Sequence, residues 1–393
     1  MKVSEYIKSK NYSTNEFIGL SLSFLSVALT IYWFVKSRII DLNGGCGNDG
    51  LTYCSMALGN VEFEPFSRRT FLPAIVKLLG FENIVLTFYI LNSIFILGSI
   101  YFSYLILKKF NYKNRFLIVG LIILNPHVIR WLFAYPVATD FLGLMLVSMF
   151  FYYFLVIQKQ EVRIITLSSI LIILCFVREN VPLIMGVGIL LWSLYVKRRV
   201  TESIFLTLMA VFSTIISFGQ PSTINTVQET NLVELAKDQI YFFTQSPQNF
   251  LMFVYFVFFG LTLLAMKAIS LIPKSSDSYG GIYLALLATT ITSPLFGGEA
   301  RHFVLASIIF QIYFLLKVDD PRVISFYLIS TIAFWNLGSF GDGSIESFMR
   351  LFGQRFVPLE VTFDLLNTGL LTWAFLLTVY LFVTRFSAVR SRK

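Results

Sequence analysis

The sequence predicts an all-α polytopic membrane protein, a single membrane domain over residues 1–393 with about twelve transmembrane helices and long outer loops. Hydrophobic residues make up 56% of the chain and charged residues only 13%, about half the charged fraction of an average soluble protein. The apolar residues form continuous runs of about 20 residues, the length that crosses the hydrocarbon core of a bilayer. This composition excludes a soluble enzyme, a disordered chain and a disulfide scaffold. Because the runs are continuous and do not alternate, a membrane β-barrel is also disfavoured.

Each predicted span corresponds to one apolar run, with ends uncertain by several residues. In chain order the twelve runs are 17–40, 83–107, 116–133, 137–157, 164–177, 181–196, 202–219, 249–270, 281–295, 303–317, 323–339 and 361–384. The fifth, sixth, ninth and tenth runs are short, which leaves a re-entrant pair open as an alternative. The first run is too long for the core of a signal peptide and has no small-residue cleavage site after it, so we expect it to stay in the protein.

The distribution of charge predicts the orientation of the spans. Twelve spans place both termini on one side, and that side carries 20 of the 31 Lys and Arg residues, while the other carries 15 of the 22 Asp and Glu residues. Because basic residues collect in cytoplasmic loops, we expect both termini in the cytoplasm and the chain in the inner (plasma) membrane of a cell. The sequence pI of about 9.3 then reflects topology. It does not predict nucleic-acid binding, because no soluble basic domain exists.

Three outer segments are long, whereas the cytoplasmic connections are short. The outer segments are 41–82, 220–248 and 340–360, and the second of them contains a candidate interfacial helix at 232–243 with apolar residues along one face. Functional residues tend to lie on loops that a rigid scaffold positions. The outer face is therefore the predicted active face.

The first outer loop is the most unusual stretch of the chain. Four glycines fall within residues 44–50 and surround Asp49, so the backbone there can bend sharply and approach a ligand closely. The following residues 51–58 can form a helix, which would place Asp49 at or near a helix N-terminus. Asp49 then serves either as a catalytic carboxylate or as an ordinary helix cap. Cys46 and Cys54 share this loop, and their spacing allows both a disulfide and two free thiols.

A second group of charged residues lies at predicted outer ends of spans. Ionisable groups at membrane depth are costly, so they normally pair or line a wet cavity. If the helices form a bundle, these groups should converge; the alternative is local salt bridging or snorkelling at the interface. The group comprises Arg130, Asp140, Arg178, Glu179, Glu299, Arg301 and His302.

These residue types suit glycosyl transfer from a lipid-linked donor. A carboxylate beside a sugar hydroxyl can act as general base, and Arg or His can hold a phosphate leaving group and neutralise its developing charge. A site at the membrane suits a donor whose phosphate is attached to a long isoprenoid, because the lipid can remain in the bilayer during the reaction.

The ordered pattern of these residues resembles the GT-C superfamily of integral-membrane glycosyltransferases, which use polyprenyl-phosphate sugars. The resemblance covers roughly residues 1–320, and the order and topology carry more of it than any single motif. Its features are Asp49-Gly-x-x-Tyr53-x-x-Met56-Ala57, Arg69-x-Phe71-x-Pro73, Asn125-Pro126 with Arg130, Thr139-Asp140, Arg178-Glu179 and Glu299-x-Arg301-His302.

The resemblance implies a role for each matching residue. Asp49 falls on the catalytic aspartate of the first outer loop, and Asp140 on a second acidic residue that assists it. The donor phosphate would be held by Arg or His at outer helix ends, for which the candidates are Arg69, Arg178, Arg301 and His302. The full predicted substrate-binding set is Tyr53, Arg69, Arg130, Arg178, Glu179, Glu299, Arg301 and His302.

Two features depart from parts of the superfamily. Metal-dependent members tend to carry closely spaced acidic pairs in outer loops, whereas this chain has Glu62-Phe-Glu64, no Asp-x-Asp and only two His. No metal ligands are therefore assigned, no cofactor is assigned with certainty, and a divalent cation is left open. The chain also has no large outer C-terminal domain, and the part beyond about residue 340 is matched least.

The predicted function is a hexosyl- or pentosyltransferase that moves a sugar from a polyprenyl-phosphate donor to a glycan, lipid or protein acceptor on the outer face. The resemblance implies inversion, with Asp49 as base. Two alternatives stay open. A transporter or flippase suits twelve spans, but the two halves show no similarity and the central cytoplasmic connection is short. A polysaccharide polymerase or ligase usually has Arg-rich outer loops, whereas segment 220–248 has a single basic residue, Lys237.

Overall fold

A computed structural model of the chain describes residues 46, 49–63, 66–112, 115, 132, 136–223, 237 and 241. Within these residues the protein is all-helical. Its elements in chain order are α3 (Asp49–Leu58), the short 3₁₀ helix η2 (Phe66–Arg68), α4 (Phe71–Leu79), α5 (Ile84–Lys109), α8 (Asp140–Val156), α9 (Gln160–Cys175), α10 (Val181–Val196) and α11 (Val200–Phe218).

Five of the predicted spans fall in this part of the chain, and each contains a helix. The spans 83–107, 137–157, 164–177, 181–196 and 202–219 correspond to α5, α8, α9, α10 and α11. Of these, α5 and α11 are long and apolar enough to cross a bilayer, whereas α8 and α10 are shorter apolar helices. The other seven predicted spans lie outside the described residues apart from Leu132, and so does the candidate interfacial helix apart from Lys237 and Tyr241.

Local sequence explains where several of these helices begin and end. The Asn83 side chain accepts a hydrogen bond from the backbone N–H of Leu86 at 2.9 Å and so caps the start of α5. Lys108 and Lys109 occupy the last turn of α5, where positive charge complements the helix dipole. Helix α4 ends at Gly80, whose φ of 64° lies in the left-handed region that glycine adopts without strain.

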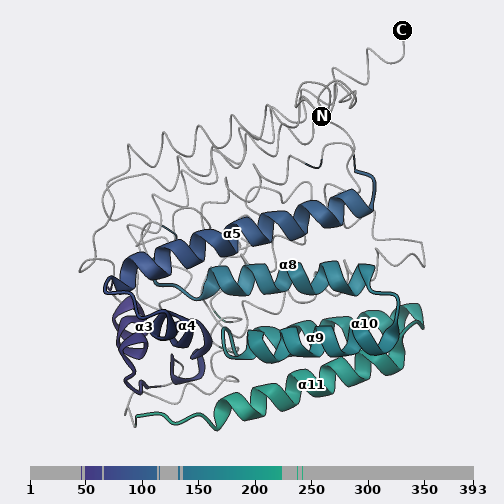
Figure 1. The fold of residues 1–393 in the computed structure, drawn as a ribbon. Coiled ribbons are helices and arrows are strands. Elements are labelled where there is room, and N and C mark those ends of the chain that lie inside the picture. Colours follow the sequence, from purple (N-terminus) through teal and green to yellow (C-terminus); the bar gives the residue numbers. More distant parts are fainter. Residues whose placement is uncertain are drawn as a thin grey trace, which may run out of the picture.

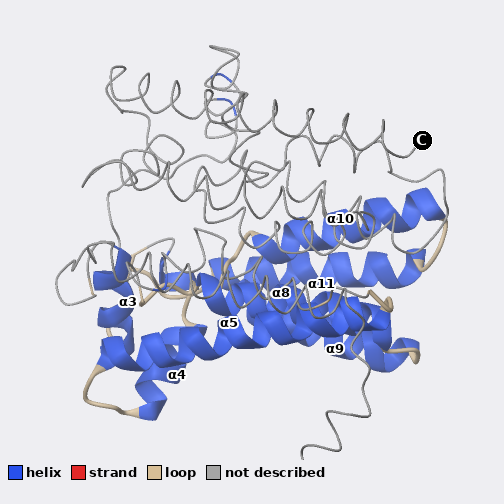
Figure 2. Cartoon of the chain, turned by 90° about the horizontal axis from the view of Figure 1, so that it is seen from above, coloured by secondary structure: helices blue, strands red, loops and turns tan. Residues whose placement is uncertain are grey.

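The long helices form a layered bundle (Figures 1 and 2). Helix α5 packs on α8, α8 packs on α9, and α11 packs against both α9 and α10. At the α10–α11 contact a Cβ added to Gly186 would lie 3.1 Å from the Cα of Thr207. Such close approach of backbones is typical of helices that pack in membranes through small residues.

Helices α3 and α4 lie at one end of this bundle, where α5, α8 and α10 begin and α9 and α11 end (Figure 1). This alternation of direction agrees with the predicted order of outward and inward spans. The opposite end carries the basic residues Lys108, Lys109, Lys159 and 197–199. The two ends of the bundle therefore differ in charge, and the predicted outer residues gather at the end that holds α3 and α4.

The basic end also contains a buried ion pair. Arg163 directly precedes the predicted span 164–177; it lies in the first turn of α9 and is buried. Its Nε and Nη2 each donate to a carboxylate oxygen of Glu202 at 2.6 Å, and its Nη1 donates to the Ile157 carbonyl at 2.7 Å. Arg163 thus joins α9 to α11 and satisfies a carbonyl at the C-terminus of α8.

Candidate functional site

The turn between α9 and α10, residues 176–180, contacts several other elements through its backbone. The Phe176 carbonyl accepts from the backbone N–H of Phe71 at 3.2 Å. The Val177 carbonyl accepts from Thr139 Oγ1 at 3.4 Å, and the Glu179 carbonyl from Thr214 Oγ1 at 3.4 Å. Pro182 follows in the first turn of α10, where it does not disturb the helix. The turn is therefore fixed from three sides, which orients the side chains of the two charged residues within it.

Glu179 of this turn forms a bidentate ion pair with Arg69, which lies between η2 and α4. Arg69 Nε donates to Oε2 at 3.0 Å and Nη2 to Oε1 at 2.9 Å. Burial opposes ionisation of both groups. The opposite charge and the hydrogen bonds of the partner outweigh this effect for each of them. The pKa of Glu179 is lowered to about 2, and the pKa of Arg69 is raised above its ordinary value. Both groups are therefore charged at neutral pH.

Arg178, the neighbouring residue, pairs with a different partner. Its Nε and Nη2 donate to Asp140 Oδ1 at 2.9 and 2.5 Å, and Asp140 is the first residue of α8. A carboxylate is favourable there because the helix dipole is positive at its N-terminus. Arg178 is 1% exposed, and its Nη1 has no hydrogen-bond partner among the residues that the structure describes.

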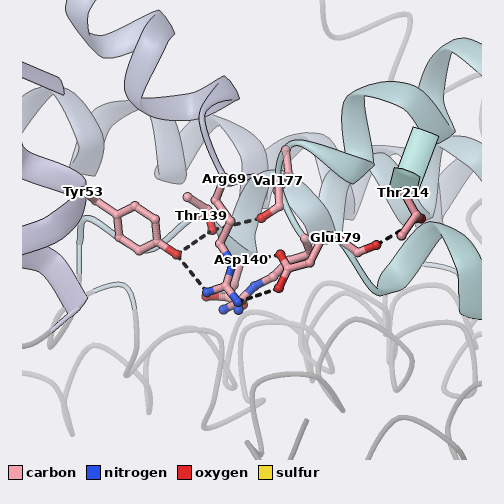
Figure 3. Close-up of polar contacts among 8 residues, drawn as sticks. Tyr53, Arg69, Thr139, Asp140, Val177, Glu179 and Thr214 are labelled. Carbon is pink, nitrogen blue, oxygen red and sulfur yellow. Dashed lines mark hydrogen bonds and ion pairs between the residues drawn. The ribbon is translucent and has the colours of Figure 1, made fainter. Parts of the chain in front are cut away.

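Tyr53 links the first ion pair to α8. Its ring is buried, its hydroxyl accepts from Arg69 Nη1 at 3.2 Å, and Thr139 Oγ1 lies 3.5 Å from the same hydroxyl. Figure 3 shows Tyr53, Arg69, Thr139 and Glu179 directed toward one another from separate parts of the fold. Thr139 immediately precedes Asp140, so both ion pairs belong to a single connected network.

Asp49 lies close to this network in the fold. Helix α3 begins at Asp49, which agrees with the expectation of a helix start at this residue. The structure does not describe its side chain. Its position is four residues before Tyr53, and residues four apart share one face of a helix. A disulfide joins Cys46 to Cys54, which settles the alternative that spacing left open and ties residue 46 to the middle of α3.

The charges of the network determine what it can do chemically. Two guanidinium groups face two carboxylates, so the four side chains are neutral together. Glu179 is a poor proton acceptor, because the Arg69 charge lowers its pKa to about 2. The Asp140 carboxylate already accepts two hydrogen bonds from Arg178. Arg178 Nη1 is a buried donor without a described hydrogen-bond partner. Among the described residues, no three His, Cys, Asp or Glu side chains are grouped as they would be to hold a metal ion.

The structure thus brings together Tyr53, Arg69, Asp140, Arg178 and Glu179, and it places the backbone of Asp49 one helical turn from Tyr53. The remaining predicted site residues, Arg130, Glu299, Arg301 and His302, lie outside the described residues. Arg178 and Glu179 are adjacent but do not pair with each other. Arg178 pairs with Asp140, 38 positions away, and Glu179 pairs with Arg69, 110 positions away.

Two polar residues of this region were not identified from the sequence. Thr139 was noted only as part of a motif, although its hydroxyl touches both Tyr53 and the 176–180 turn. Asn92 was not singled out at all. The signal in the sequence was a single amide within the apolar run that forms α5, since a polar side chain in such a run is costly unless it has partners. In the structure this side chain is fully buried.

Comparisons with protein-family models, with curated proteins and with solved structures found no match to this chain.

Proposed function

We propose that this protein is an inverting membrane glycosyltransferase that moves a sugar from a polyprenyl-phosphate donor to an acceptor hydroxyl at the outer membrane face. The observation that carries the proposal is the buried network of Tyr53, Arg69, Glu179, Asp140 and Arg178 at one end of an apolar helical bundle. The network adjoins the helix that begins at Asp49. Such a concentration of buried charge is expensive in a membrane protein and therefore supports a functional role for this end of the bundle.

In this proposal Asp49 is the general base. The acceptor hydroxyl gives its proton to Asp49 while its oxygen forms a bond to the anomeric carbon of the donor sugar. The bond from that carbon to the phosphate oxygen breaks, and polyprenyl phosphate leaves with the electron pair. The resemblance to the GT-C superfamily assigns this role to Asp49. Asp140 and Glu179 suit it less, because both are paired with arginines.

Arg178 is the proposed contact for the donor phosphate. Its Nε and Nη2 are fixed by Asp140, while Nη1 has no hydrogen-bond partner among the described residues. A fixed guanidinium with a remaining donor can bind a phosphate oxygen without first reorganising. Because the network is neutral in total, further positive charge has to come from elsewhere in the chain. Arg130, Arg301 and His302 remain the proposed sources.

The proposed orientation places α3 and the network on the outer side. The Cys46–Cys54 disulfide supports it, because disulfides persist in oxidising compartments and are rare in the cytosol. The basic residues at the opposite end of the bundle support it too, because Lys and Arg collect on the cytoplasmic side. We therefore propose a multi-pass inner-membrane protein with both termini in the cytoplasm.

A transfer assay tests the proposal. The purified chain is reconstituted in liposomes with a panel of radiolabelled polyprenyl-phosphate sugars and candidate acceptors, and labelled product is measured for wild type, Asp49→Asn and Glu82→Gln. Glu82 is an exposed carboxylate just before α5 at the same end of the bundle. It therefore serves as a matched control for the loss of one negative charge.

The proposal predicts transfer by wild type and by Glu82→Gln, and a loss of about 100-fold or more in Asp49→Asn, since general-base catalysis contributes about 10²–10⁴ in rate. Transfer that survives Asp49→Asn would remove Asp49 as the base. Solute or lipid translocation by wild type with no transfer from any donor would overturn the enzyme assignment and favour a carrier.

A further inference from the structure

Asn92 of α5 holds the backbone that leads into α8. Its side chain is fully buried, and its Nδ2 donates to the Pro136 carbonyl at 2.6 Å and to the Ala138 carbonyl at 2.9 Å. Both partners are carbonyl oxygens, which only accept, so the amide nitrogen is the group that must face them. The Asn92 amide therefore donates two hydrogen bonds to the backbone of segment 136–138.

That segment needs such a donor. Residues 136–139 are not helical, and Asn92 lies in a helix long and apolar enough to span a bilayer. Non-helical backbone at membrane depth is tolerated only where its polar groups are satisfied within the protein. An apolar residue at position 92 would remove the donor to the Pro136 and Ala138 carbonyls, and a buried carbonyl without a partner is destabilising.

The segment held by Asn92 runs directly into the candidate site. Thr139 follows Ala138 and touches the Tyr53 hydroxyl and the Val177 carbonyl. Asp140 comes next, and its Oδ1 accepts from Nε and Nη2 of Arg178. A short path of contacts therefore joins Asn92 to Arg178 through one stretch of backbone, although the Asn92 amide itself touches neither Tyr53 nor Arg178 in any contact that the structure describes.

We infer that Asn92 is a positioning residue for the candidate site: by fixing residues 136–138 it sets the place of Asp140 and hence of the Arg178 guanidinium. The kinetic consequence of this inference rests on the proposed transferase function, but the structural consequence does not. Misplacement of a substrate-positioning group by about 1 Å can cost about 100-fold in rate. Asn92 is thus expected to control the reaction without contacting the substrate.

The experiment compares Asn92→Ala, Asn92→Ser and Asn92→Asp with a neighbouring control, Ser93→Ala. Ser93 lies on the same helix, and among the described residues its hydroxyl donates only to the Tyr89 carbonyl of its own helix, at 2.8 Å. Alanine removes both bonds of Asn92, serine offers one shorter O–H donor, and aspartate replaces the two N–H donors with a carboxyl group that has at most one O–H to donate. Each full-length variant is purified in mild detergent and reconstituted as the wild type is.

The first readout does not depend on transfer activity. The chain has three cysteines; two form the disulfide, and the third, Cys175, is a buried free thiol. Cys175 directly precedes the 176–180 turn, against which Thr139 packs. The rate of Cys175 labelling by a maleimide should rise in the order Ser, Ala, Asp at position 92, and stay at the wild-type rate in Ser93→Ala.

The second readout is transfer kinetics combined with Asp140→Asn. Asn92→Ala should lower kcat/KM about 10- to 100-fold and Ser93→Ala less than twofold. In a double-mutant cycle the effects of Asn92→Ala and Asp140→Asn should be strongly less than additive, because both act through the placement of Arg178. A general loss of packing would instead give additive effects.

The outcomes separate the two claims. Absence of transfer in the wild type with the predicted order of Cys175 labelling would overturn the proposed function and leave the structural role of Asn92 standing. Wild-type labelling rates in all three Asn92 variants would overturn the inference, and so would an additive cycle. If Asn92→Ala fails to fold, Asn92→Ser still tests the inference, because Cys175 must react with the maleimide faster in Asn92→Ser than in Ser93→Ala.

Discussion

The Arg69–Glu179 ion pair permits a quantitative prediction for the substitution Glu179→Gln. The pair is bidentate, with N–O distances of 2.9 and 3.0 Å, and the two side chains are 8% and 14% exposed. Removing one partner of a buried pair leaves the other charge uncompensated and costs about 3–5 kcal/mol. The Arg69 guanidinium would keep the Tyr53 hydroxyl, the Phe66 ring and the uncharged amide oxygen at position 179 as partners, but it would lose its compensating negative charge. We therefore expect Glu179→Gln to lower the free energy of unfolding by about 3–5 kcal/mol.

The assay is unfolding of the purified protein in mild detergent by titration with a denaturing detergent, followed by circular dichroism. Glu82→Gln is the control and should change the unfolding free energy by less than about 0.5 kcal/mol, as exposed substitutions usually do. The double variant Arg69→Met with Glu179→Leu should recover at least half of the loss, because it removes the buried charge altogether. If Glu179→Gln is as mild as Glu82→Gln, Arg69 and Glu179 are not paired and buried as described.

Three further predictions follow from other contacts. The pKa of Glu179 is about 2 in the folded protein against an ordinary value near 4.5. The stability that this carboxylate contributes is therefore fully present above about pH 4.5 and is lost as the pH falls toward 2. The free energy of unfolding, measured as the pH is lowered, should show this loss in wild type and a smaller loss in Glu179→Gln. Glu202→Gln should lower the free energy of unfolding by about 3–5 kcal/mol, because it leaves the buried Arg163 charge without its charged partner. The proposed transfer site lies at the opposite end of the bundle, so kcat/KM for transfer should change less than threefold. Thiol titration of the denatured protein should find one free cysteine before reduction and three after it; three before reduction would contradict the disulfide.

Much of the described fold could be predicted because apolar runs determine where helices form in such a chain. The helix α10 occupies Val181–Val196, the range predicted, and Asp140 begins α8 as expected for a charged residue at the entry of a span. Helix α9 begins at Gln160, four residues before the predicted span 164–177, within the uncertainty of the predicted ends. Arg163 in this first turn pairs with Glu202 of α11, which the apolar run did not indicate.

The candidate site was predictable as a set of residues but not as a set of contacts. The scarcity of charge in an apolar chain singled out Asp140, Arg178 and Glu179, and their convergence follows from a bundle of alternating helices. The pairing of Arg178 with Asp140, and of Glu179 with Arg69, depends on how the 176–180 turn is oriented. That orientation comes from backbone contacts between distant segments, which no local pattern encodes.

Asn92 shows a different limit of sequence reasoning. Its amide is one polar group in a run whose average hydropathy remains that of a spanning helix, so a search for charged residues passes over it. Only the structure reveals its contacts, because the Pro136 and Ala138 carbonyl oxygens lie 2.6 and 2.9 Å from its Nδ2. The sequence also left the disulfide open, because a separation of eight positions between Cys46 and Cys54 allows the bond without requiring it.

The central claim is that the buried network beside α3 serves sugar transfer from a lipid-linked donor with Asp49 as base. The most direct measurement is the release of polyprenyl phosphate from a radiolabelled polyprenyl-phosphate sugar, in the presence of acceptor, by wild type and Asp49→Asn in the same liposomes. The account predicts release by wild type that matches product formed mole for mole, and about 100-fold slower release by Asp49→Asn. Equal release by the two proteins, or none by either with any donor, would contradict it.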